Sequence, residues 1–292
     1  MSAPRQWGLA ALVFGLFIHG VAAFADASAW NRDRHAAIRL LAGSRAAGGA
    51  LLIGGIEIEL QPGWKTYWRT PGDSGVPPRF DFSGSDNIET VTVLWPAPEK
   101  FPDGNGGFSF GYHERVVLPL RIVAKDAGKP VTLRAAIQYA VCEKLCIPLE
   151  TSAKIQFSEA VSTQDGMLKS ALERLPQPAR IGEAGPLAVR DIRLGQAAPG
   201  GKPRLLIDIA APPRTAVELF AEGPTDKWTL PAPVLVARAA DGTQHFTLDL
   251  GGAPAGAALR ETTLRLTLVG ADNAYEIAVP LAAALPLADK GQ

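Results

Sequence analysis

The chain has 292 residues, with 29 basic and 29 acidic side chains, so its formal net charge is zero. A chain with this charge balance shows no excess of the basic residues that nucleic-acid binding requires, so we expect no nucleic-acid partner. The 30 glycines and 24 prolines, with short apolar segments between turns, favour an all-β protein over a disordered chain.

The first 25 residues have the pattern of a cleavable signal peptide. Arg5 precedes an apolar run from Trp7 to Val21, and the small residues Ala23 and Ala25 mark a cleavage site. This run of about 15 residues is shorter than the roughly 20 that a membrane-spanning helix needs. We therefore expect cleavage after Ala25 and export to the periplasm. No later segment has enough apolar residues to span a membrane, so electron exchange with a membrane would require a partner protein.

Residues 30–160 are predicted to form an immunoglobulin-like β-sandwich, because short alternating segments are separated by turn residues. The predicted strands are Ala36–Leu41, Ala50–Leu60, Trp64–Trp68, Arg79–Phe82, Glu89–Leu94, Val116–Val123, Val131–Val141 and Ile147–Phe157. Between the third and fourth of these, the segment 70–78 is rich in glycine and proline and is predicted to be a long turn.

A short helix is predicted at Thr163–Leu175, within a linker at residues 161–185. Its apolar residues fall at helical spacing, and Pro176 and Pro178 end the pattern. Residues 186–285 predict a second immunoglobulin-like sandwich. Because this half has no cysteine and no polar cluster, we interpret it as a spacer or docking module. Its expected strands are Leu187–Leu194, Arg204–Ile209, Ala216–Phe220, Lys227–Ala237, His245–Leu250, Thr262–Val269 and Ala274–Leu281.

Only two cysteines occur, Cys142 and Cys146. In an oxidising compartment we expect them to form a disulfide at least part of the time. In one continuous strand they would lie about 13 Å apart, whereas a disulfide needs Cα atoms within about 4.4–6.8 Å. The chain must therefore reverse, or make a helical turn, at residues 143–145. Alternating apolar residues before and after the pair favour two strands joined by a turn.

A redox role for the pair is favoured over a structural one. Closing a loop this small stabilises a fold by roughly 2 kcal/mol, against more than about 4 kcal/mol for a loop of 100 residues. Lys144 favours a neighbouring thiolate and Glu143 opposes it, so the sequence leaves the thiol pKa open. Two alternatives remain: a local structural staple, and a Cu(I) site, although no methionine or histidine cluster accompanies the pair.

Four segments together resemble the periplasmic N-terminal domain of the DsbD family of disulfide reductases, in particular its ScsB-like branch. The resemblance covers about residues 35 to 160. The segments are QYAVCEKLCIP at Gln138–Pro148, PGWKTYW at Pro62–Trp68, PGDSG at Pro71–Gly75 and FSFGY at Phe108–Tyr112.

The resemblance implies a carrier of reducing equivalents that needs no small-molecule cofactor. A membrane-embedded thiol reductase would supply electrons, and periplasmic thioredoxin-like or disulfide-containing proteins would accept them. It further implies that Cys146 attacks and Cys142 resolves, and that Phe108 and Phe110, after the glycine-rich segment 104–107, form an aromatic cap over the pair. The chain departs from the family in its three-residue cysteine spacing. It also has no transmembrane or thioredoxin-like region of its own, so we expect a separate protein as electron donor.

Other marked residues have simpler interpretations. Trp64, Tyr67 and Trp68 are expected to pack in the core rather than to form a ligand platform. His113 is a possible tuning residue for a thiol, with Glu143 and Lys144, although an exposed surface histidine is the simpler interpretation. For the whole chain, the alternatives to thiol–disulfide exchange are an exported binding or assembly module with a structural disulfide, and a copper-handling protein.

The small loop generates a first prediction. Reducing the disulfide should lower the free energy of unfolding by about 2 kcal/mol at most, because a ring this small constrains the unfolded chain little. Chemical denaturation with and without reductant measures the difference. A loss of about 4 kcal/mol or more would identify the pair as a structural staple.

Overall fold

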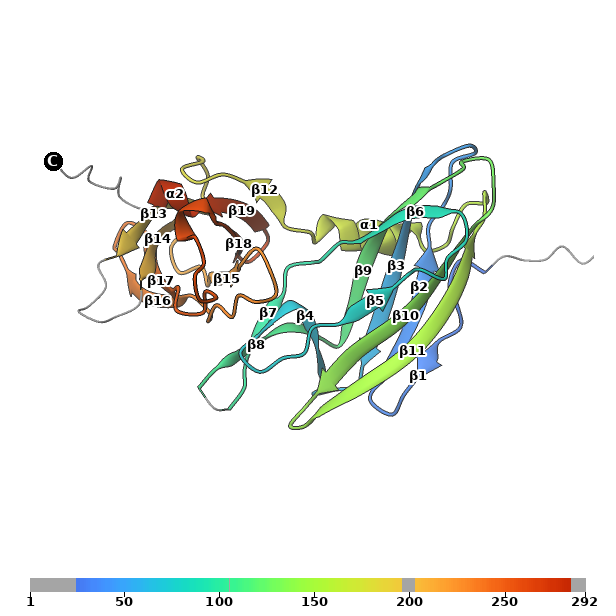
Figure 1. Ribbon diagram of the computed structural model, residues 1–292, viewed down its shortest axis with the longest axis horizontal. Helices are drawn as coiled ribbons and strands as arrows, with labels where there is room; N and C mark the ends of the chain where they lie inside the picture. The colour runs from blue at the N-terminus through green and yellow to red at the C-terminus, as the bar shows by residue number, and fades with distance from the viewer. Residues whose placement is uncertain (1–24, 105, 196–202, 285–292) are drawn as a thin grey trace, which may run out of the picture.

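The computed structural model describes residues 25–104, 106–195 and 203–284. The expected signal peptide therefore lies almost wholly outside the described residues. The described chain is nearly all β and forms two sandwiches that lie side by side (Figure 1). This confirms the predicted fold class. Among the described residues, no helix has the length and apolar character needed to cross a membrane.

The first sandwich packs two largely antiparallel sheets face to face. One has the order β1-β2-β3-β9-β6, and the other has the order β11-β10-β4-β8-β7, with β5 also paired to β10. The strands are β1 (Asn31–Arg32), β2 (Ala36–Ala42), β3 (Leu51–Leu60), β4 (Lys65–Gly72), β5 (Arg79–Asp81), β6 (Ile88–Val93), β7 (Glu99–Pro102), β8 (Phe108–His113), β9 (Arg115–Ala124), β10 (Val131–Cys142) and β11 (Cys146–Phe157).

Apolar side chains at alternate positions along the strands fill the space between these two sheets. Ile38 and Leu40 of β2 face Leu133 and Ile137 of β10 across one hydrophobic cluster, and each is at most 1% exposed. Trp68 of β4 is fully buried in the same cluster. Because burial of such large side chains is the dominant favourable term in folding, this core fixes the position of β4 and β10.

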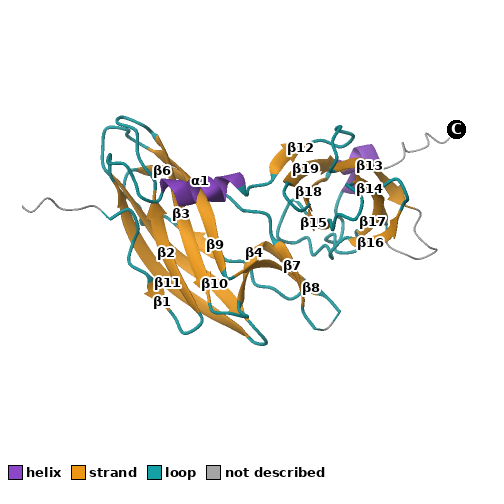
Figure 2. Cartoon of the chain, turned by 180° about the vertical axis from the view of Figure 1, so that it is seen from behind, coloured by secondary structure: helices purple, strands orange, loops and turns teal. Residues whose placement is uncertain are grey.

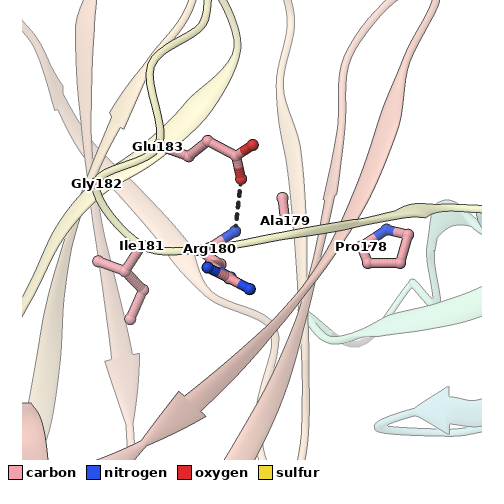
Figure 3. Close-up of a pocket in the computed structure, with 6 residues that line it drawn as sticks. All are labelled: Pro178, Ala179, Arg180, Ile181, Gly182 and Glu183. Atoms are coloured by element: carbon pink, nitrogen blue, oxygen red, sulfur yellow. Dashed lines mark hydrogen bonds between the residues drawn. The ribbon is translucent and has the colours of Figure 1, made fainter.

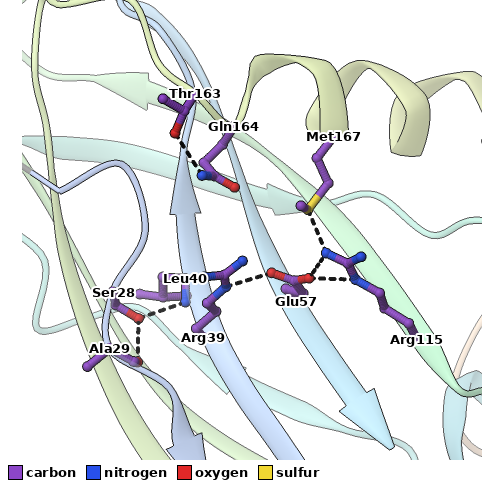
Figure 4. A network of polar contacts seen from close by, with 9 residues as sticks. All are labelled: Ser28, Ala29, Arg39, Leu40, Glu57, Arg115, Thr163, Gln164 and Met167. Carbon is purple, nitrogen blue, oxygen red and sulfur yellow. Dashed lines mark hydrogen bonds and ion pairs between the residues drawn. The ribbon is translucent and has the colours of Figure 1, made fainter.

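Helix α1 (Asp165–Glu173) covers the outer face of the first sheet and confirms the predicted linker helix (Figure 2). Beneath it, Glu57 is fully buried between two guanidinium groups (Figure 4). Arg39 Nε lies 2.6 Å from Glu57 Oε2, and Arg115 donates both to Glu57 Oε1 and to Met167 Sδ of the helix. Through Arg39 and Arg115, the buried carboxylate connects β2, β3 and β9 with α1. Loss of either arginine would leave a costly unpaired charge in the interior.

The second sandwich packs a sheet of order β12-β19-β18-β15 on a sheet of order β13-β14-β17-β16. Its strands pair antiparallel except β12, which runs parallel to β19. The elements are β12 (Gln177–Ala179), β13 (Ala188–Gly195), β14 (Arg204–Ala210), β15 (Glu218–Glu222), β16 (Val234–Arg238), β17 (Thr243–Asp249), β18 (Thr263–Val269), β19 (Ala274–Pro280), a 3-10 turn at Leu259–Glu261 and a short helix α2 (Leu281–Ala284).

Two expectations about the first sandwich are wrong. β4 does not end at Trp68 but continues to Gly72, where a turn was expected. The sequence pattern also missed β7 and β8, whose glycine- and proline-rich surroundings resemble a loop. β4 and β8 pair with each other although they lie far apart in the sequence, so neither segment alone indicates the pairing. Both also contact the second domain, since Trp68 and Phe110 pack on Phe220.

Candidate functional site

The two cysteines form a disulfide at the tip of a hairpin. β10 and β11 pair without interruption from Val131–Phe157 to Cys142–Cys146, which leaves residues 143–145 as a three-residue turn. The Cα atoms of the pair lie 4.2 Å apart, close to the spacing of directly opposite residues in an antiparallel ladder. The structure thus confirms the predicted strand–turn–strand geometry rather than a helical turn.

The two cysteines differ in their exposure to solvent. Cys142 is 6% exposed and packs with Tyr67 and Ala140 in a small apolar cluster. Cys146 is exposed, and the neighbouring Leu145 at the tip is 75% exposed. A partner protein can therefore approach Cys146 more readily than the buried Cys142.

Tyr67 of β4 contacts the exposed sulfur. Its Oη lies 3.0 Å from Cys146 Sγ, and a disulfide sulfur carries no proton, so the phenol must be the donor. Burial raises the pKa of Tyr67, which keeps the hydroxyl protonated at neutral pH. The contact follows from the register of β4 on β10, which pairs Thr66 with Val141 and Lys65 with Cys142.

Lys65 shares this face of the sheet, because directly opposite residues of paired strands project to the same side. Its Nζ donates to Ser109 Oγ at 2.8 Å and lies 5.3 Å from the centre of the Phe101 ring. Burial lowers the pKa of Lys65, and the nearby carboxylate of Asp103 partly offsets that effect. The ammonium group of Lys65 is thus held toward β8 and β7, on the same face of the sheet as the cysteine pair.

A groove of about 580 Å³ begins beside the cysteine turn. Trp64, Lys65, Phe101, His113 and Glu143 are among the residues that line it. Its lining thus combines aromatic rings with charged side chains. Glu143, one of the expected tuning residues, lies in the cysteine turn and borders this groove.

His113, another tuning candidate, is engaged by a neighbour. Its Nδ1 lies 2.8 Å from Glu99 Oε2 on β7, and the imidazole is about half exposed. It lines the same groove as Glu143. Lys144, the third candidate, is exposed in the cysteine turn.

The expected aromatic cap requires correction, because the structure does not bring Phe108 and Phe110 to the disulfide. Both lie on β8 and project into the main core, on the opposite side of the sheet from Tyr67 and Cys142. Phe110 is 1% exposed, and its ring packs edge-on at 4.9 Å against Phe220 of the second domain. The alternation of side chains along a strand, rather than a mobile loop, decides their placement.

Tyr67 is the site residue that sequence reasoning missed. It was expected to be a core residue, and it is indeed 2% exposed, but its hydroxyl reaches the disulfide. The signal that identifies it is the pairing of β4 with β10, a contact between segments more than 70 residues apart. Periodicity within the segment 64–68 shows that Tyr67 and Trp68 face opposite sides but not which side holds the cysteines.

Other hollows in the described chain lack comparable chemistry. One of about 610 Å³ lies at Pro178–Glu183 in the second domain, and its carboxylate, Glu183, accepts a hydrogen bond from the backbone N–H of Arg180 (Figure 3). Within the ranges that the structure describes, no group of three or more histidine, cysteine, aspartate or glutamate side chains is arranged to hold a metal ion.

The fold and the site define an immunoglobulin-like domain that carries a disulfide, with one buried and one exposed cysteine, at the tip of a hairpin. Residues 39–158 match the family described as "Thiol:disulfide interchange protein DsbD, N-terminal". This part of the chain is therefore an N-terminal domain of the DsbD family, a family of thiol–disulfide interchange proteins.

The fold of both sandwiches also has a solved counterpart. The N-terminal periplasmic domain of ScsB from Proteus mirabilis superposes with a TM-score of 0.68 at 19% sequence identity, over 87% of this chain and 97% of that one. No curated protein matches the chain. At this identity the match concerns the fold, and it includes the second domain.

The Tyr67 contact generates a second prediction. Tyr67→Phe should raise the pKa of the Cys146 thiol by about one unit, because a hydrogen bond to a charged group is worth roughly 1.5–3 kcal/mol. The pH dependence of alkylation of the reduced protein measures it. Tyr139→Phe, which removes a hydroxyl from the core face of β10, is the matched control. Equal profiles for Tyr67→Phe and the parent would contradict the assigned contact.

Proposed function

We propose that this protein is a periplasmic thiol–disulfide exchange protein, which carries reducing equivalents from a membrane-embedded thiol reductase to exported proteins through Cys142 and Cys146. The observation that carries the proposal is the hairpin-tip disulfide with one exposed cysteine, whose sulfur accepts a hydrogen bond from a phenol. Family membership and a fold shared with a periplasmic ScsB domain support the compartment and the chemistry. The acceptors are thioredoxin-like or other disulfide-containing proteins.

The exchange proceeds in two displacements at sulfur. The Cys146 thiolate attacks one sulfur of a partner disulfide, forms a mixed disulfide and expels the partner's other sulfur as a thiolate. The Cys142 thiolate then attacks Cys146 Sγ, which closes the internal disulfide and releases the partner's remaining thiolate. Two electrons pass to the partner, and the two protons lost by the cysteines balance those that the partner thiolates take up.

The surroundings of the pair suit this order of attack. Cys146 is exposed and receives the Tyr67 hydrogen bond, which favours its thiolate. Cys142 is buried next to it and meets Cys146 at the distance set by the hairpin register. It therefore reaches the mixed disulfide more readily than it reaches a partner in solution.

A structural staple is the second candidate function, for an exported binding or assembly module. The exposure of Cys146 and the small ring do not favour it, because protected disulfides that close long loops are the stabilising ones. A copper-handling role has less support, since two sulfurs stand without further soft ligands among the described side chains.

The order of attack generates a third prediction. Cys142→Ala should accumulate stable mixed disulfides with partner proteins, because the resolving thiol is gone, whereas Cys146→Ala should accumulate few or none. Non-reducing electrophoresis of the exported protein, with release of partners by reductant, measures the difference. Equal trapping by both variants, or trapping only through Cys142, would reverse the roles of the two cysteines.

A further inference from the structure

The ladder between β4 and β8 is irregular immediately after the residue that contacts the disulfide. Its pairing with β10 covers Lys65 and Thr66, and its pairing with β8 continues to Tyr67, which lies opposite Gly111. The ladder with β8 is then interrupted and resumes only at Gly72. Residues 68–71, which follow Tyr67 directly, therefore form a bulge that has no regular register with β8.

The second domain packs an aromatic side chain against this bulge. Phe220 of β15 is fully buried, and its ring centre lies 5.8 Å from that of Trp68 and 4.9 Å from that of Phe110. Phe220 belongs to the hydrophobic cluster of the first domain rather than to that of its own. Edge-to-face packing of this kind fixes the orientation of the rings.

Charged groups complete the contact. Arg69 donates through Nε and Nη2 to the two carboxylate oxygens of Glu222, at 2.9 and 2.7 Å, and also to Glu276 Oε2 at 2.7 Å. Thr70 Oγ1 donates to Glu222 Oε1 at 2.7 Å. Glu222 is 7% exposed. Because the arginine–carboxylate pair is bidentate, it fixes the orientation of the guanidinium plane relative to the carboxylate plane.

We propose that the second domain is a clamp on β4 that positions Tyr67 against Cys146. Successive side chains of a strand project to opposite faces, so fixing Trp68 against Phe220 directs Tyr67 toward the disulfide. Phe220 and Glu222 are then positioning residues for a thiol more than 70 residues away in sequence. This inference rests on the proposed function, because it gives the second domain a part in setting the reactivity of the exchanging thiol.

The test measures the pH profile of Cys146 alkylation by iodoacetamide in the full chain carrying Cys142→Ala. Glu222→Gln keeps the shape of the side chain but removes its charge, so β4 gains freedom and Tyr67 leaves the sulfur part of the time. The rate at pH 7 should fall about threefold, with the profile displaced to higher pH. Phe220→Leu should act in the same direction. Thermal denaturation verifies that each variant is folded. If Phe220→Leu does not fold, the result for Glu222→Gln alone decides the test.

Two comparisons make the result specific. Asp208→Asn on β14 removes a comparable carboxylate, which pairs with Arg193 and His245. This variant should leave the profile unchanged. In a Tyr67→Phe background, Glu222→Gln should have no further effect, because the residue through which it acts is gone. An unchanged profile for folded Glu222→Gln, or an equal displacement with and without the Tyr67 hydroxyl, would overturn the clamp. Alkylation needs no protein partner, so it remains readable even if the trapping experiment finds none.

Discussion

The register of a single hairpin is the constraint on which the disulfide site depends. β10 and β11 are each twelve residues long and pair from end to end, so the apolar residues that the core demands also determine which residues meet at the tip. A slip of one position would turn the core face outward and place Cys142 opposite a residue other than Cys146. Core packing therefore holds the two sulfurs together, and their bond adds little to it.

β4 connects this site to the rest of the molecule. Within a few residues it presents Lys65 and Tyr67 to the cysteines, Trp68 to the hydrophobic core and Arg69 to the second domain. The aromatic-rich segment of the sequence is thus both a core element and part of the site. The second sandwich, which carries no cysteine, contributes Phe220 to the first domain's core. This contact gives a physical reason for two immunoglobulin-like domains in a protein with one disulfide.

The sequence predicted the features that depend on residues close together in the chain. Most strands of the two sandwiches, the helix at Asp165–Glu173 and the reversal at the cysteines follow from alternation, proline positions and the reach of a disulfide. The errors concern pairings between distant segments. Glycines before Phe108 resembled a mobile loop, yet β8 pairs with β4 and β7, and its rings enter the core. Tyr67 looked like a core residue because its register with β10 cannot be obtained from its own segment.

The reduction potential of the Cys142–Cys146 pair tests the central claim most directly. Equilibration of the full chain with defined ratios of reduced and oxidised dithiol, followed by alkylation and separation of the two forms, gives the value. An exposed pair in a small ring, used for exchange, should lie in the range of known carriers, roughly −120 to −270 mV. A potential below about −300 mV, typical of structural disulfides, would contradict the account.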